Sequence, residues 1–320
     1  MRLLFIGTPD FAVTSLRALL DSRHEVAAVL TRPDRPRLHR SSAPGPSPVK
    51  TEARSRGLRV LQPETLSEPG LLADLVGLAP DAIVVVAYGR ILPPEILGLP
   101  PRWCINLHAS LLPKYRGAAP VARAVMAGER VTGVTTMRMD KGLDTGDILL
   151  QRECPIGLDE TTGELTSRLA PRGADLLVET LDRHERGALE PRRQNPQEAT
   201  QAPPLSKADG RIDWSRGAVE IANRVRACNP WPLAFSFLRG RPVKILRSEV
   251  SFESGAGGRR GVPGQVIDAD GRRILVQCHG DSRLAILKMR FRSGRTVSAR
   301  DAVNGRLIRV GDVLASPPGG

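Results

Sequence analysis

The feature that most constrains the fold is an uninterrupted apolar run, AIVVVA, at Ala82–Ala87. Its length and β-branched residues predict a strand that is covered on both faces, as in parallel sheets packed between helices. Other short apolar runs predict strands at Leu3–Gly7, Glu25–Leu30, Leu58–Leu61, Ile105–Leu107 and Val131–Met139. Helical spacing of apolar residues occurs over Phe11–Leu20, Ala119–Ala127 and Leu165–Leu181. This alternation predicts a doubly wound, mainly parallel α/β sheet over residues 1–188.

The pattern changes in the second half of the chain. Residues 189–206 are rich in Pro, Gln and charge without apolar periodicity, which is typical of a linker. Beyond them, strands separated by turn signals are predicted at Ala234–Leu238, Val243–Ser248, Gly264–Asp268, Ile274–Cys278 and Leu284–Met289, after one helix over 215–228. Many short strands with Gly-rich turns predict a small β-barrel, which we place at residues 207–315.

The charge is distributed unevenly between these halves. The chain has 47 Lys and Arg against 34 Asp and Glu, a net charge of +13. Residues 1–204 carry 26 basic and 24 acidic side chains, whereas residues 205–320 carry 21 and 10. One interpretation of this charge is a solvated arginine-rich surface, because codon bias can explain why Arg outnumbers Lys. Codon bias does not explain why one half of the chain is nearly neutral and the other is basic. We therefore expect the C-terminal half to contact a polyanion, either a nucleic acid or a membrane surface.

Several protein classes are disfavoured. No run approaches the roughly 18–20 apolar residues of a membrane-spanning helix, and the apolar run Leu3–Ile6 is too short for a signal peptide, so a cytoplasmic protein is expected. The four cysteines form no CxxC pair, which argues against a zinc ribbon or a disulfide framework. The first strand is followed by GTPDF rather than GxGxxG, and no GxxxxGK[ST] occurs, so a nicotinamide or nucleotide cofactor is not expected.

The segment CINLHASLLPKYRGAAP, residues 104–120, is a candidate for catalysis. Residues two apart on a strand point the same way, so Asn106 and His108 present an amide beside an imidazole. Such a pair suits stabilisation of an oxyanion together with a proton transfer. A capping asparagine and a core histidine are the structural alternatives.

A second loop, MDKGLDTGDILL at residues 139–150, holds Asp140, Asp144 and Asp147 between two strands. The three aspartates can be turn residues, because Asp side chains hydrogen-bond locally to the backbone. One of them can instead face His108 and orient its ring. A metal site is disfavoured because no second His or Cys lies near, and we expect no metal.

Together these motifs resemble the 10-formyltetrahydrofolate-dependent formyltransferases. The resemblance rests on NLH, SLLPKYRGAAP and GLDTGDIL, and FIGTPDFA, TRPDRP, PSPVK, NPWP and VNG match the branch that formylates methionyl initiator tRNA. It implies a Rossmann-like catalytic domain, an OB-like barrel that binds tRNA, 10-formyltetrahydrofolate as co-substrate, no metal or nucleotide, and a monomer. It also implies that Asn106, His108 and Asp144 are catalytic. The tetrahydrofolate site would include Ser110, Leu111, Leu112 and Pro113.

The resemblance suggests where tRNA would bind. The arginine-rich stretch 31–50 would contact the acceptor stem, with Arg37 or Arg40 supplying the contact, although this chain reads RLHRSSAPG where the family has a cluster like GRGKK. Lys207 matches a second family position near the tRNA. The two tryptophans Trp214 and Trp231 are expected to pack rather than to stack on bases. Since aromatic residues are 3% of the chain, phosphate contacts should dominate and tRNA binding should depend steeply on salt.

Four other functions remain open at this point. A small amine such as an amino sugar, or water in a formyl-folate hydrolase, would use the same three catalytic residues without needing a basic barrel. A non-catalytic RNA-binding module would not need the intact Asn–His–Asp set. The assignment as a nicotinamide oxidoreductase is supported only by the predicted topology of the sheet.

Overall fold

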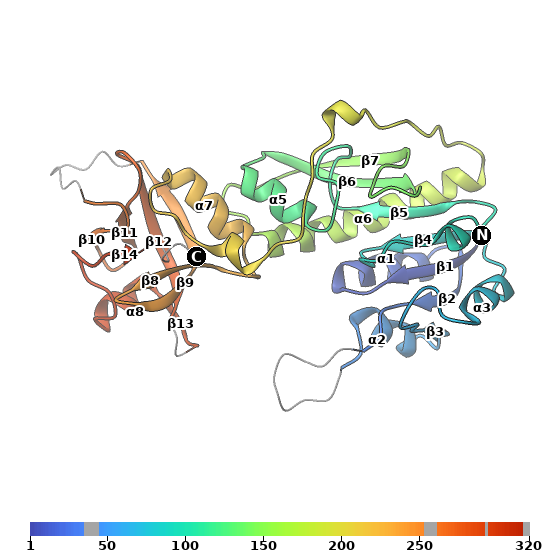
Figure 1. Cartoon of the computed structure of the whole chain (residues 1–320), viewed down its shortest axis with the longest axis horizontal. Coiled ribbons are helices and arrows are strands. Elements are labelled where there is room, and N and C mark those ends of the chain that lie inside the picture. The colour runs from blue at the N-terminus through green and yellow to red at the C-terminus, as the bar shows by residue number, and fades with distance from the viewer. Residues whose placement is uncertain (35–44, 253–260, 292–293, 316–320) are drawn as a thin grey trace. The chain divides into compact units, whose positions relative to one another are not determined.

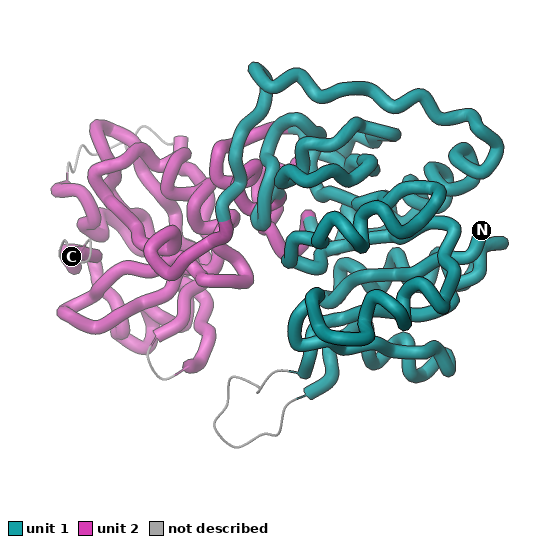
Figure 2. Tube along the Cα trace, turned by 45° about the vertical axis from the view of Figure 1, so that its right-hand side comes forward, with its two compact units in different colours: residues 1–120, 131–155, 166–203 teal, residues 121–130, 156–165, 204–320 magenta. Residues whose placement is uncertain are grey.

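A computed structural model describes residues 1–34, 45–252, 261–291 and 294–315 (Figure 1). The chain forms two compact units, each assembled from segments far apart in sequence (Figure 2). Unit 1 comprises residues 1–120, 131–155 and 166–203, and unit 2 comprises 121–130, 156–165 and 204–320. The domain limits expected from the sequence, with a catalytic domain at 1–188, a linker at 189–206 and a barrel at 207–315, stay a prediction.

Unit 1 is built on a seven-stranded sheet in the order β3-β2-β1-β4-β5-β6-β7 (Figure 1). The strands are β1 (Arg2–Gly7), β2 (Glu25–Leu30), β3 (Val60–Leu61), β4 (Ala82–Val86), β5 (Cys104–His108), β6 (Val131–Arg138) and β7 (Ile148–Pro155). The first five are parallel, whereas β6 and β7 are antiparallel to their neighbours. The predicted doubly wound, mainly parallel sheet is therefore confirmed. Every residue of β4 is buried, as its continuous apolar run requires.

Six helices accompany these strands in the chain: α1 (Asp10–Leu20), α2 (Pro48–Ser55), α3 (Leu71–Gly77), α4 (Pro94–Leu97), α5 (Pro120–Ala127) and α6 (Thr162–Glu185). Helix α2 starts where Ser47 accepts a hydrogen bond from the Lys50 backbone and proline occupies the first turn. Helix α6 packs on β5 so closely that a Cβ added at Gly173 would lie 2.8 Å from Leu107. Side chains alternate along a strand, so this contact leaves the opposite face of β5 to Asn106 and His108.

Unit 2 is an antiparallel barrel around one apolar core. Besides most of α5 and the first turn of α6, it contains α7 (Ala218–Ala227), β8 (Ala234–Leu238), β9 (Arg241–Ser251), β10 (Val266–Ala269), β11 (Ile274–Gln277), β12 (Arg283–Arg290), β13 (Thr296–Ser298), α8 (Ala299–Asn304) and β14 (Leu314–Ala315). The strands run β10-β11-β12-β9-β8-β14, with β13 paired to β12. A bridge between Gln265 and Val313 joins the two ends of this order, which closes the sheet. The predicted β-barrel is confirmed.

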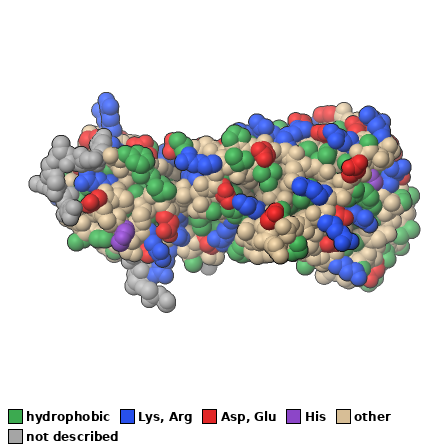
Figure 3. Space-filling model, turned by 90° about the horizontal axis from the view of Figure 1, so that it is seen from above, with side chains coloured by type: hydrophobic (Ala, Val, Ile, Leu, Met, Phe, Trp, Pro, Cys, Tyr) green, Lys and Arg blue, Asp and Glu red, His purple; other side chains and the backbone are tan. Residues whose placement is uncertain are grey.

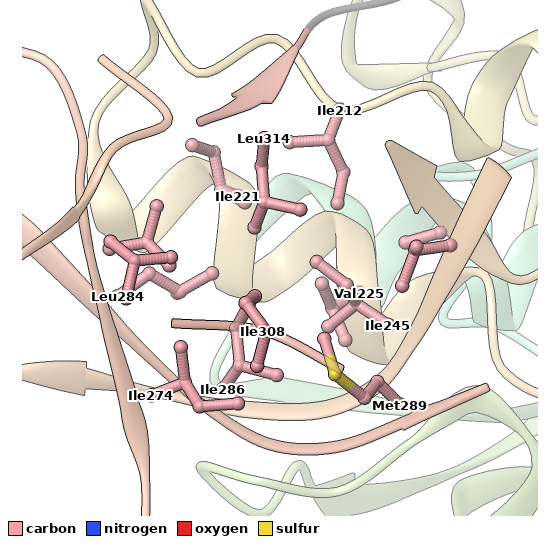
Figure 4. Close-up of a cluster of buried hydrophobic side chains, with 14 of the residues drawn as sticks. Ile212, Ile221, Val225, Ile245, Ile274, Leu284, Ile286, Met289, Ile308 and Leu314 are labelled. Carbon is pink, nitrogen blue, oxygen red and sulfur yellow. The ribbon is translucent and has the colours of Figure 1, made fainter. Parts of the chain in front are cut away.

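The core of unit 2 forms between α7 and the inner faces of the strands. In Figure 4, Ile221 and Val225 of α7 lie among strand residues such as Ile245 and Ile286. Trp214 is buried in this core, where its indole nitrogen donates to the Ser236 hydroxyl over 3.0 Å, so its predicted packing role is confirmed. Trp231 lies outside this core, with 55% of the residue exposed, so the same expectation for Trp231 stays a prediction.

Two absences hold for the described part of the chain. No helix there is long and apolar enough to cross a membrane. No group of three or more His, Cys, Asp or Glu side chains there is arranged to hold a metal ion.

Candidate active site

Strand β5 positions the predicted amide and imidazole. It lies between β4 and β6, with Asn106 opposite Val85 and His108 opposite Thr135, and all five of its residues are buried. Asn106 is 8% exposed. Among the described residues its side-chain amide has no hydrogen-bond partner. The amide is therefore held in place by the strand and is free to bind a ligand.

The two ring nitrogens of His108 face two different oxygen atoms. Nε2 lies 2.9 Å from the backbone oxygen of Tyr115, and Nδ1 lies 3.6 Å from Oδ2 of Asp144. The first contact is a hydrogen bond that places a proton on Nε2, because a carbonyl oxygen can only accept. The second is longer than a hydrogen bond, so Nδ1 retains the capacity to exchange a proton with a substrate or a bridging water.

The loop between β6 and β7 brings Asp144, rather than Asp140, to His108. Asp144 adopts a left-handed backbone with φ of +53°, and its Oδ2 accepts a hydrogen bond of 2.8 Å from the Gly117 backbone. Asp140 serves the turn instead, because its Oδ1 accepts from the backbone of Gly142 and the hydroxyl of Thr145. Asp144 has side-chain exposure of 15%, which leaves its carboxylate accessible beside the ring.

The predicted tetrahydrofolate residues 110–113 form a loop pinned to β6 and β7. The Thr135 hydroxyl donates to the backbone oxygen of Ser110 over 2.6 Å and accepts from the backbone nitrogen of Leu112 over 3.2 Å. Gln151 of β7 donates to the Leu112 oxygen over 2.9 Å. The sequence reasoning missed Thr135 and Gln151, and the signal for them is a polar side chain at a buried or half-buried strand position.

Unit 1 also contains a cavity of about 600 Å³ that the sequence reasoning missed. It is lined by Glu64, Thr65, Leu66, Ser67, Arg90, Ile91, Leu92, Pro93, Pro94 and Lys141. Lys141 belongs to the same loop as Asp144, which links this cavity to the catalytic candidates along the chain. Its lining is mostly apolar and includes two cationic side chains, Arg90 and Lys141, and one acidic side chain, Glu64, which suits an organic ligand with an anionic end.

The residues predicted to contact tRNA are described only in part. Arg37 and Arg40 lie outside the described residues. Lys207 is exposed and begins a 3₁₀ helix, Lys207–Gly210. On the face drawn in Figure 3, basic and acidic side chains are interspersed, so overall charge does not by itself locate a binding surface.

The barrel carries a more specific basic feature. On adjacent strands β9 and β12, Lys244 pairs with Arg290 and Arg247 pairs with Lys288. Like charges placed directly opposite each other destabilise a sheet. Arg247 is compensated by Glu164, but no described residue forms an ion pair with Lys244, Lys288 or Arg290. We call these last three side chains the basic ladder. The sequence reasoning did not single them out, because register decides which charges are opposite.

Known proteins resemble this chain over nearly its whole length. A family model described as Formyl transferase matches residues 1–181, and one described as Formyl transferase, C-terminal domain, matches residues 204–307. The protein named methionyl-tRNA formyltransferase of Citrifermentans bemidjiense is 45% identical over 98% of this chain and 96% of its own. That of Solibacter usitatus is 46% identical over 98% of both chains.

Solved structures share the fold at lower identity. The sugar 3N-formyl transferase WlaRD, solved with dTDP and 5-N-formyl-THF, aligns with a TM-score of 0.66 at 17% identity, covering 89% of this chain and 97% of its own. An N-formyltransferase from Helicobacter canadensis, solved with folinic acid and dTDP-3-aminofucose, gives 0.64 at 19% identity, covering 89% and 98%.

Proposed function

The chain belongs to the formyl transferase family, and we propose that Asn106, His108 and Asp144 carry out its chemical step. Relatives that match it over nearly their full length are named methionyl-tRNA formyltransferases. The chain transfers the formyl group of 10-formyltetrahydrofolate to the α-amine of methionyl initiator tRNA. The observation that carries the site assignment is the His108–Asp144 pair beside the unpartnered Asn106 amide.

The reaction begins when the uncharged methionyl amine attacks the formyl carbon. A C–N bond forms, and the carbonyl electron pair moves to oxygen. Asn106 donates a hydrogen bond to this oxygen, and His108 stabilises its negative charge. A preorganised donor of this kind contributes roughly 3–4 kcal/mol to the transition state.

Asp144 completes the proton transfers. It holds His108 and accepts the proton that the attacking nitrogen loses, through a bridging water. The tetrahedral centre then collapses: the electron pair on oxygen re-forms the carbonyl, the bond to N10 breaks with its electron pair moving to N10, and N10 takes up the proton that Asp144 had accepted. The products are formyl-methionyl-tRNA and tetrahydrofolate.

Folate binding is proposed for the 110–113 loop together with the 600 Å³ cavity. Pinning by Thr135 and Gln151 gives the loop a fixed backbone against which the co-substrate can lie. The cavity has the size of a small-molecule site, and Arg90 and Lys141 can pair with the glutamate carboxylates of the folate tail.

The tRNA surface is proposed to include Lys207 and the basic ladder, and Arg37 or Arg40 at the acceptor stem. Uncompensated cations on one barrel face favour a phosphate backbone, since counterion release on binding offsets their mutual repulsion. The protein is proposed to act as a monomer. A substrate consumed in translation supports a cytoplasmic location. Analytical ultracentrifugation and cell fractionation test these two points.

One assay tests the function against its alternatives. Labelled 10-formyltetrahydrofolate is supplied with methionyl initiator tRNA, methionyl elongator tRNA, an amino sugar nucleotide, or no acceptor. Label on initiator tRNA alone is expected. Label on the sugar, or free formate without any acceptor, would instead indicate the amino-sugar transferase or the hydrolase. Normal turnover by folded His108→Ala protein would refute the site assignment.

A further inference from the structure

The segment predicted as a linker is hydrogen-bonded to the candidate active site within unit 1. Arg192 exchanges two backbone hydrogen bonds of 2.8 Å with Ile148 at the start of β7. Farther along, the Thr200 hydroxyl accepts from the backbone of Tyr115, the residue whose carbonyl holds His108. Arg116 pairs through its backbone with Thr200 and Ala202. Residues 192–202 therefore lie along the loops that form the site, although their composition resembles a spacer.

Gln194 is the one polar side chain among residues 192–202 that is buried, at 9% exposure, and both the nitrogen and the oxygen of its amide are hydrogen-bonded. Its Nε2 donates to the backbone oxygens of Asp144 and Gly146, over 2.9 and 2.7 Å. Its Oε1 accepts from Nε and one terminal nitrogen of Arg116, over 3.0 and 2.7 Å. Arg116 is itself 8% exposed. These partners fix the orientation of the amide, since a guanidinium can only donate and a carbonyl can only accept.

We propose that Gln194 is a positioning residue for formyl transfer, which holds the Asp144 turn so that its carboxylate faces His108. The left-handed backbone of Asp144 is unfavourable for a residue with a Cβ and persists only where neighbours hold it. Gln194 holds this turn from the backbone side. The Gly117 nitrogen holds the carboxylate itself, and Arg116, which precedes Gly117, is held by the same glutamine. Gln194 thus binds both the backbone of the Asp144 turn and the residue that precedes the Gly117 nitrogen, which holds the Asp144 carboxylate.

This inference rests on the proposed role of Asp144 and predicts a particular kinetic signature. Gln194 does not line the 600 Å³ cavity, and no hydrogen bond joins its side chain to residues 110–113 among the described contacts. Its loss should therefore lower kcat and leave the KM values for both substrates nearly unchanged. A substitution that merely loosened the fold would reduce the amount of active protein and leave kcat per folded molecule unchanged.

The test compares Gln194→Glu with Gln197→Glu. The first keeps the size of the side chain and the acceptor for Arg116, but it replaces both donors to the loop carbonyls with an acceptor. The second makes the same chemical change at an exposed glutamine three residues away. Per folded molecule, kcat should fall about 10- to 100-fold in Gln194→Glu, with each KM within about threefold of the parent, and Gln197→Glu should match the parent. A parent-like kcat, or a change confined to KM, would overturn the proposal.

A double-mutant comparison separates positioning from general damage. If Gln194 acts through Asp144, then adding Gln194→Glu to Asp144→Asn should cost less than about threefold more, whereas independent effects would multiply. Full multiplication would overturn the proposal. Gln194→Met, which keeps the length without any hydrogen bond, serves the same comparison if Gln194→Glu does not fold. A parent without initiator-tRNA formylation would instead contradict the proposed function.

Discussion

The basic ladder provides a direct test of how the barrel binds tRNA. The perturbation is the triple variant Lys244→Gln, Lys288→Gln, Arg290→Gln. In the parent, Lys244 and Arg290 lie opposite each other across β9 and β12, and Lys288 lies opposite Arg247. Neutralising them removes the uncompensated like-charged pair Lys244–Arg290, which is unfavourable by about 0.2–1 kcal/mol, whereas Arg247 opposite Lys288 is already compensated by Glu164. The folded variant should therefore be at least as stable as the parent in thermal unfolding.

Affinity for tRNA should change in the opposite direction. Each phosphate contact contributes about −0.7 to −0.9 to the slope of log K against log salt concentration. Removing three contacts should therefore make the slope shallower by about 2 to 3. When salt is raised from about 50 to 200 mM, both proteins lose affinity for tRNA. The loss in the variant should be about 20- to 40-fold smaller than the loss in the parent. The kcat at saturating tRNA should stay the same, since the ladder belongs to unit 2 and the proposed catalytic residues to unit 1.

The assay is tRNA binding by fluorescence anisotropy over a salt series. A matched control replaces three other exposed arginines of unit 2, Arg272, Arg306 and Arg309, with glutamine. This control changes the net charge equally but leaves the ladder intact, so its slope should stay near that of the parent. Equal slopes for the two triple variants would refute the reasoning, because only the total charge would then matter.

Three further predictions concern unit 1. Asp144→Asn keeps an oxygen that can accept from the Gly117 nitrogen, but it removes the negative charge beside His108. We therefore expect kcat to fall about 100- to 1,000-fold, with an unchanged midpoint of thermal unfolding. A kcat within about threefold of the parent would contradict this prediction. Gly146→Ala would place a Cβ against the carbonyl oxygen of Arg138, which ends β6, so we expect loss of turnover in the assay and a destabilisation of about 1–3 kcal/mol by calorimetry. A variant with the turnover and stability of the parent would contradict this. Burial lowers the pKa of His184 below its ordinary value, so the unfolded chain binds its proton more readily and stability declines as pH falls below about 6.5. His184→Phe keeps the stacking on Trp103, at 4.1 Å between ring centroids, and should flatten the dependence of unfolding free energy on pH between about pH 7 and 5; an unchanged slope in denaturant titrations would contradict this.

The sequence predicted the parts of the fold that depend on apolar burial. The run at residues 82–87 became the fully buried β4, and the helix expected at 165–181 became α6 at Thr162–Glu185. Short elements such as β14, with two residues, were not predicted, because they hold too few residues to show a period. Pairing of Asn106 with His108 followed from strand alternation alone.

Polar contacts with the backbone could not be predicted in the same way. The composition around Gln194 predicts a linker, because periodicity detects only apolar residues. The glutamine side chain instead binds backbone carbonyl groups, which have no sequence signature. The basic ladder depends on register shifts in β12 between Ile286 and Met289, and a shift of one residue would change which charges are opposite. The burial of Trp231 could not be predicted either, because a turn sequence does not indicate whether an aromatic side chain in it is packed or exposed.

The composite make-up of unit 2 has a consequence for recombination between related enzymes. Within this unit, the Thr162 hydroxyl binds the Ala227 oxygen over 2.8 Å, and Arg123 forms an ion pair with Asp209 at 2.6 Å. A chimera joined near residue 204 would inherit one partner of each contact from each parent. An exchange that keeps both contacts must transplant residues 121–130 and 156–165 together with the C-terminal segment. Crossovers at the apparent domain boundary should therefore be tolerated mainly between parents that match in these two short inserts.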